Sequence, residues 1–130
     1  MKLEHIGLNV SDPRAATAWY QQHLGLKVVF QKATAPFTTF LADSSGTMML
    51  EIYNNPPDQV PPYATMSPFL LHVAFVSQDP EADKAALLSA GATFLEESRL
   101  QDGSLILTLR DPWGLAIQFC RRTTPMLRGP

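Results

Sequence analysis

The chain has 130 residues, 45% of them hydrophobic, with 10 basic and 12 acidic side chains and a formal net charge of −2. This length suits a single domain with one sizeable core, and the near-neutral charge gives no electrostatic basis for binding nucleic acid or an anionic membrane. No apolar run approaches the ~20 residues of a transmembrane helix and no signal peptide follows Met1, so we expect a cytoplasmic protein, in keeping with a lone cysteine, Cys120.

Residues 1–54 predict a strand, a helix and three further strands. Polar and apolar side chains alternate over residues 3–10, which is the period of a half-buried strand. Asp12 before Pro13 is typical of a helix start, and Gly25 suits the left-handed residue that follows a helix ending near Leu24. Three strands are then expected, over residues 27–32, 36–42 and 47–54, with a turn at 43–46.

Residues 55–68 predict a linker, because five prolines between 54 and 68 cannot continue a sheet. The second module, residues 69–122, repeats the order of the first, and residues 123–130 form a short tail. The expected elements of the second module are a strand over 69–77, a helix over 80–90 and strands over 93–97, 104–110 and 115–121. The whole chain is therefore one domain made of two tandem repeats.

The two modules align with an offset of 67 positions, and the alignment pairs polar strand residues. His5 falls on His72, and Glu51 falls on Gln118. One helix for four strands covers only one face of a sheet, and alternation places all four residues on the other face. Two such sheets side by side would enclose a cleft lined by these residues. We therefore predict an α+β fold in which two βαβββ modules form a curved, half-barrel mixed sheet with the helices outside.

Two imidazoles, a carboxylate and an amide suit one divalent metal ion, which could be Fe, Mn, Co, Ni or Zn. The alternative is that His5 and His72 are core histidines whose nitrogens bond to the backbone. Their equivalent positions in the two repeats, together with Glu51 and Gln118, favour metal binding.

Four motifs carry a resemblance to a known family. They are His5 in His-Ile-Gly-Leu-Asn-Val, Glu51 in Met-Leu-Glu-Ile-Tyr, His72 in Leu-His-Val-Ala-Phe, and Asp111-Pro112-Trp113-Gly114 ahead of Gln118. With this element order, the chain resembles the vicinal oxygen chelate superfamily, which includes glyoxalase I, methylmalonyl-CoA epimerase, extradiol dioxygenases and fosfomycin or bleomycin resistance proteins. The resemblance implies that the four positions hold one divalent metal, whose open positions bind two neighbouring oxygens of a small molecule.

One residue departs from the glyoxalase I pattern. Relatives of that type usually carry a carboxylate where this chain has Gln118, so Glu51 is the only carboxylate among the four ligands. A glutamine offers a neutral oxygen to a metal but is no proton acceptor near neutral pH. Glu51 is therefore the expected catalytic base as well as a ligand.

The resemblance implies a metal-dependent lyase or isomerase of glyoxalase or epimerase type. Its substrate would be small, oxygenated and carbonyl-containing, and the reaction would pass through a metal-stabilised enediolate. Two alternatives stay open: an extradiol-type dioxygenase using His5, His72 and Glu51, or a non-catalytic protein that sequesters a ligand, as bleomycin resistance proteins do. A homodimer is expected, with the cleft built within one chain or across two.

Overall fold

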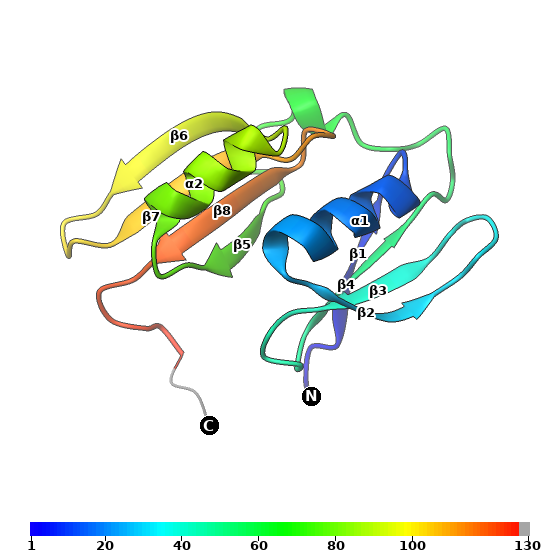
Figure 1. Ribbon diagram of the computed structural model, residues 1–130, viewed down its shortest axis with the longest axis horizontal. Coiled ribbons are helices and arrows are strands. Elements are labelled where there is room, and N and C mark those ends of the chain that lie inside the picture. Colours follow the sequence, from blue (N-terminus) through cyan, green and yellow to red (C-terminus); the bar gives the residue numbers. More distant parts are fainter. Residues whose placement is uncertain (128–130) are drawn as a thin grey trace. The chain divides into compact units, whose positions relative to one another are not determined.

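The computed structural model describes residues 1–127, so the end of the predicted tail, 128–130, lies outside the described residues. The chain divides into two compact units, an N-terminal unit of Met1–Pro61 and a C-terminal unit from Pro62 onward (Figure 1). The point of division falls within the proline-rich segment 55–68. Among the described residues, each unit contains one α-helix and four strands, which confirms the predicted α+β class and the two βαβββ modules.

The N-terminal unit places its strands in the order β1-β4-β3-β2. Strand β1 pairs with β4 in parallel, and the other neighbouring pairs are antiparallel. The sheet is therefore mixed, and β1 and β2 are its edges. Its elements are β1 (His5–Asn9), α1 (Pro13–Leu24), β2 (Lys27–Gln31), β3 (Thr39–Ala42) and β4 (Met49–Tyr53).

The C-terminal unit repeats this topology with the order β5-β8-β7-β6, and β5 pairs with β8 in parallel. A short 3-10 helix, η1 (Tyr63–Thr65), precedes the sheet. The other elements are β5 (Val73–Val76), α2 (Pro80–Ser89), β6 (Thr93–Arg99), β7 (Leu105–Arg110) and β8 (Ala116–Arg121).

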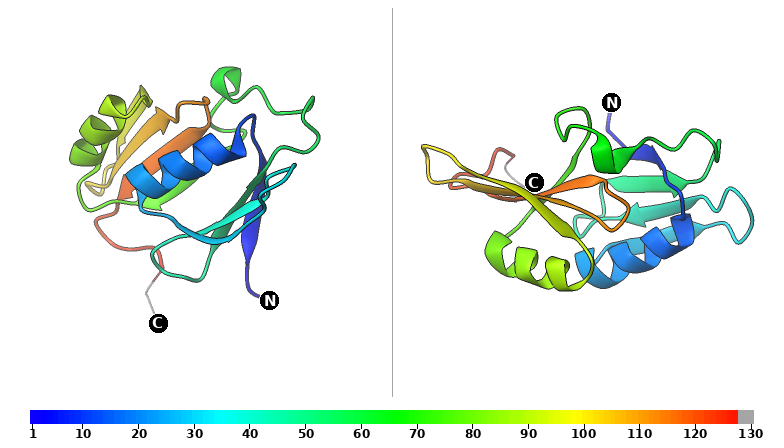
Figure 2. Two further views of the ribbon diagram at one scale, coloured as in Figure 1. Left: turned by 45° about the vertical axis from the view of Figure 1, so that its right-hand side comes forward. Right: turned by 90° about the horizontal axis from the view of Figure 1, so that it is seen from above.

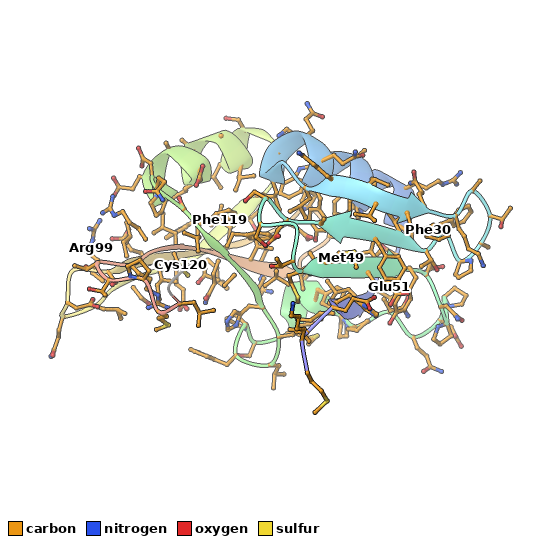
Figure 3. The ribbon with its side chains drawn as sticks, turned by 90° about the horizontal axis from the view of Figure 1, so that it is seen from below. Phe30, Met49, Glu51, Arg99, Phe119 and Cys120 are labelled. Atoms are coloured by element: carbon orange, nitrogen blue, oxygen red, sulfur yellow. The ribbon has the colours of Figure 1, made fainter. Side chains whose placement is uncertain are left out.

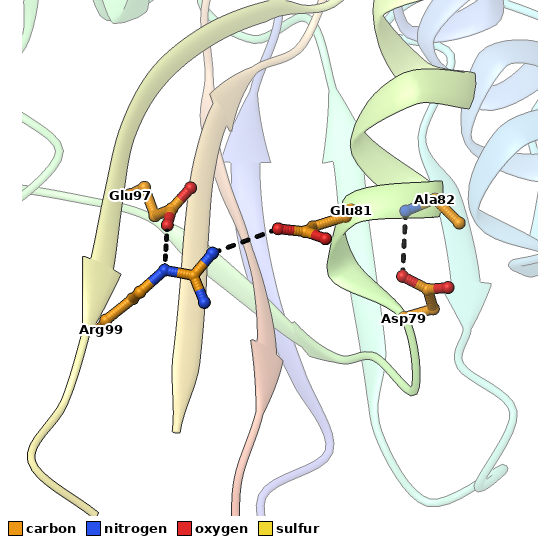
Figure 4. A network of polar contacts seen from close by, with 5 residues as sticks. All are labelled: Asp79, Glu81, Ala82, Glu97 and Arg99. Carbon is orange, nitrogen blue, oxygen red and sulfur yellow. Dashed lines mark hydrogen bonds and ion pairs between the residues drawn. The ribbon is translucent and has the colours of Figure 1, made fainter. Parts of the chain in front are cut away.

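Both helices begin where the sequence predicts, because an aspartate caps each one. The Oδ1 atom of Asp12 accepts a hydrogen bond from the Ala15 backbone N at 3.0 Å, and Asp79 accepts one from Ala82 at 3.1 Å (Figure 4). Each cap satisfies a backbone N–H that the first helical turn leaves without a partner. Gly25 follows α1 with φ of 67°, the left-handed conformation that glycine adopts without a steric penalty.

Each helix packs on one face of its own sheet (Figure 2). In the N-terminal unit, the side chains on that face alternate with half-exposed ones and are buried, as are Trp19 and Tyr20 of α1. In the C-terminal unit, most residues of β7 and β8 are buried, and Leu87 of α2 is buried as well. The large buried apolar side chains of the strands are Leu8, Leu41, Leu50 and Ile52 in the first sheet and Leu105, Leu107, Leu109, Ile117 and Phe119 in the second.

Arg99 of β6 links α2 to the edge of its sheet. Its guanidinium Nη2 contacts Glu81 Oε1 of α2 at 3.1 Å, and its Nε bonds to Glu97 on the same strand (Figure 4). Because all three side chains are exposed or nearly so, this network contributes little to stability.

The strand predicted over 69–77 starts later than expected, at Val73. Pro68 lies in a turn, in which the Leu70 backbone N donates to Ser67 O at 3.0 Å and the Phe69 N donates to Ser67 Oγ at 3.2 Å. Residues 69 and 70 are therefore exposed despite their apolar side chains. Composition alone indicated a strand, but the hydrogen bonds of this turn compete with pairing.

Candidate metal and substrate site

In the N-terminal unit, the structure brings two of the four predicted site residues together. The His5 Nε2 atom lies 3.4 Å from Glu51 Oε2. The two side chains come from the parallel pair β1 and β4, in which His5 pairs with Met49 and Gly7 pairs with Glu51. Their side chains are 36% and 23% exposed, so both remain accessible to a small ion or ligand.

These residues belong to the face of the sheet opposite α1, which we call the N-terminal open face (His5, Gly7, Phe40, Met49, Glu51 and Tyr53). The edge of the His5 ring meets Phe40, with 5.2 Å between ring centroids, and Phe40 in turn meets Phe30 at 6.2 Å. Figure 3 labels Met49 and Glu51 on β4 and Phe30 on β2. Aromatic surface therefore adjoins the imidazole and the carboxylate.

The remaining two predicted residues lie in the C-terminal unit. His72 directly precedes β5 instead of lying within it, and its Nδ1 is 2.7 Å from Pro68 O. Gln118 lies in β8, opposite Ala74 of β5 and Thr108 of β7. Its Nε2 donates to Thr108 Oγ1 at 3.2 Å, which leaves the amide oxygen to accept another contact.

Both histidines share one arrangement that suits metal binding. Each Nδ1 faces an oxygen, which is Pro68 O for His72 and Glu4 Oε1, at 3.2 Å, for His5. An Nδ1–H donated to such an oxygen fixes the tautomer and leaves Nε2 as the basic nitrogen, which is the usual state of a metal-binding histidine. The donor atoms therefore fit a divalent ion of the predicted kind.

Within residues 1–127, no three histidine, cysteine, aspartate or glutamate side chains gather at the spacing of a metal site. His5 and Glu51 lie in strands of the N-terminal unit. In the C-terminal unit, Gln118 lies in β8 and His72 directly precedes β5. The four-residue site therefore stays a prediction.

The Asp111-Pro112-Trp113-Gly114 turn fixes the start of β8 and so the position of Gln118. The buried Asp111 carboxylate accepts hydrogen bonds from the backbone N of Trp113 and of Leu115, both at 2.9 Å. Next to it, the guanidinium of Arg110 donates to Tyr63 O, Met66 O and Gly114 O. Arg110 therefore fastens η1 to this turn.

Three residues near the predicted ligands were not identified from the sequence. Glu4 faces His5 although strand alternation points it to the other face, and Thr108 bonds to Gln118 across a strand pair that no local pattern specifies. Gly7 accommodates the ring of Tyr53.

Cys120 lies two residues beyond Gln118, and burial raises the pKa of its thiol.

Comparison with known proteins identifies the family of this chain. A family model described as the glyoxalase/bleomycin resistance protein/dioxygenase superfamily matches residues 2–119, nearly the whole chain. The chain belongs to this superfamily. No curated protein matches it.

Several solved structures of similar fold resemble the chain. SMU.1112c is 26% identical, with 93% of this chain and 98% of that one covered and a TM-score of 0.71. TnmS3, an antibiotic binding protein from Streptomyces sp. CB03234, is 17% identical, with 92% and 93% covered and a TM-score of 0.71. A lactoylglutathione lyase from Agrobacterium tumefaciens is 18% identical, with 91% of each chain covered and a TM-score of 0.67. Within residues 1–127, no helix has the length and apolar character needed to cross a membrane.

Proposed function

We propose that the protein is a metal-dependent lyase or isomerase of glyoxalase or epimerase type, acting on a small carbonyl-containing substrate. The observation that carries this proposal is the state of the two histidines. Each has its Nδ1 within hydrogen-bond distance of an oxygen, an arrangement that suits a ligand at Nε2, and the Nε2 of His5 lies 3.4 Å from the Glu51 carboxylate.

The proposed ligands are His5, Glu51, His72 and Gln118, with Gln118 contributing the amide oxygen that its bond to Thr108 leaves uncommitted. A bound divalent ion supplies Lewis-acid stabilisation of the negative charge that develops when a proton leaves the carbon beside a carbonyl. Glu51, as the one carboxylate of the set, accepts that proton. Phe40, whose ring contacts that of His5, places apolar surface beside the proposed ligands.

Metal content tests this function directly. Protein purified without added metal should contain about one divalent ion per chain by elemental analysis, and His72→Ala should contain almost none. His23→Ala is the matched control, because it removes the same ring from α1, where His23 contacts Trp19. Equal metal content in all three proteins, or none in the wild type, would contradict the proposed site.

A ligand-sequestering role is the second candidate, and it is favoured by the aromatic surface that Phe40 of the N-terminal open face forms with the neighbouring Phe30. Apolar contact can hold a ligand without a metal. Ligand binding that survives EDTA would support sequestration, whereas the enzyme proposal predicts that EDTA abolishes activity.

We also propose a homodimer, since the strand order leaves β1, β2, β5 and β6 as sheet edges within the two units. Sedimentation velocity across a range of protein concentrations measures the association directly. A single monomeric species at every concentration would contradict it.

A further inference from the structure

The ring of Tyr53 lies across the backbone of Gly7 on the N-terminal open face. A Cβ atom added to Gly7 would stand 3.0 Å from the Tyr53 hydroxyl oxygen, 3.3 Å from its Cε1 and 3.4 Å from Glu51 Oε2. The phenol hydroxyl and the carboxylate therefore flank the same glycine. Register explains this, because Gly7 pairs with Glu51, and Tyr53 follows Glu51 by two residues on the same face.

Glycine at position 7 is required for space and not for conformation. Gly7 lies inside β1 and is absent from the glycines with positive φ, so any residue can adopt its backbone conformation. A methyl group there would approach the Tyr53 hydroxyl more closely than side chains normally do. The absence of a side chain at Gly7 thus leaves room for the Tyr53 ring beside the Glu51 carboxylate.

The Tyr53 hydroxyl is a donor without an acceptor among the described residues. Tyr53 is only half-buried, and within residues 1–127 no group of the chain hydrogen-bonds to its hydroxyl. A phenol O–H usually finds a partner when its ring packs against protein. Here the ring is held by the sheet while the hydroxyl remains available beside Glu51.

We infer that Tyr53 is a further catalytic residue, which donates a hydrogen bond to a substrate oxygen next to the carbon that Glu51 deprotonates. This inference rests on the proposed function. The C–H proton passes to the Glu51 carboxylate, the C–H electron pair forms a C=C bond, and the carbonyl π pair moves onto oxygen. The Tyr53 O–H stabilises the charge that forms there and stays protonated throughout. Gly7 is a positioning residue that seats the ring.

Acetohydroxamate, which presents two adjacent oxygens, probes this arrangement without knowledge of the substrate. Its affinity for zinc-loaded protein is measured by isothermal titration calorimetry for wild type, Tyr53→Phe and the matched control Tyr20→Phe, which removes a hydroxyl on the α1 side of the same sheet. Loss of a hydrogen bond to a charged oxygen should weaken binding about tenfold in Tyr53→Phe, with no change in the control.

The outcomes separate the two proposals. If the wild type takes up no zinc, the proposed function and this inference are both overturned. If zinc-loaded wild type and Tyr53→Phe bind acetohydroxamate equally well, the role of Tyr53 alone is overturned. Thermal unfolding of each variant confirms that the compared proteins are folded.

A double-mutant cycle tests the role of Gly7. Gly7→Ala should weaken acetohydroxamate binding about as much as Tyr53→Phe, because the new methyl group displaces the hydroxyl. In the Tyr53→Phe background, Gly7→Ala should cause little further loss of affinity, since the hydroxyl oxygen that lies 3.0 Å from the added Cβ is then missing. Equal additional losses in both backgrounds would overturn the seating role.

Discussion

Gly114→Ala should be among the most destabilising single methyl additions in this chain. Gly114 has φ of 95°, and a Cβ there would stand 2.5 Å from the backbone N of Ala64 and 2.6 Å from its Cα. A side chain at positive φ costs about 1–2 kcal/mol, and overpacking costs about 1–3 kcal/mol more. The collision cannot be relieved by a rotamer change, because the opposing atoms are backbone.

Nor can η1 move away freely, since Arg110 ties it to the turn through Tyr63 O and Met66 O. We therefore expect a loss of about 2–5 kcal/mol in the free energy of unfolding, a large share of the ~5–15 kcal/mol that stabilises a typical domain. Urea unfolding followed by circular dichroism measures this loss.

Gly46→Ala is the matched control for this prediction. Gly46 also has positive φ, 68°, but no atom lies within 4 Å of its added Cβ, so only the conformational cost of about 1–2 kcal/mol applies. The difference between the two variants isolates the contact with Ala64. Equal stability losses in Gly114→Ala and Gly46→Ala would refute the close approach of η1 to this turn.

The remaining predictions concern the open faces. Glu51→Gln should keep the fold but abolish incorporation of solvent deuterium into hydroxyacetone, a small hydroxyketone, followed by NMR; undiminished exchange would place the base elsewhere. Gln118→Glu should tighten zinc binding about tenfold in a competition titration, because it adds a negatively charged metal ligand. The Thr108 hydroxyl can still donate a hydrogen bond to the new carboxylate. Unchanged affinity would put Gln118 outside the metal's ligands. Cys120 should react with a thiol reagent at pH 8 more slowly than free cysteine, because burial raises its pKa and less thiolate is present, and urea should remove the difference.

Local patterns in the sequence determined most of the fold. The aspartate and proline at 12–13 and 79–80 fixed both helix starts, and alternation separated the helix-packing residues from His5, Glu51 and Gln118. The offset between repeats predicted that both units share one topology. These features depend on residues a few positions apart, whose geometry a strand or helix fixes by itself.

Tertiary structure alone decided the contacts that give the site its chemistry. The seat of Tyr53 on Gly7 joins residues 46 positions apart, and the bond from Gln118 to Thr108 depends on the register of β7 against β8. His72 was expected within a strand, but it follows a turn, and the carbonyl oxygen of Pro68 in that turn lies 2.7 Å from its Nδ1. Such contacts depend on how strands pair and where a turn forms, and periodicity fixes the face of a side chain but not its neighbour across the sheet.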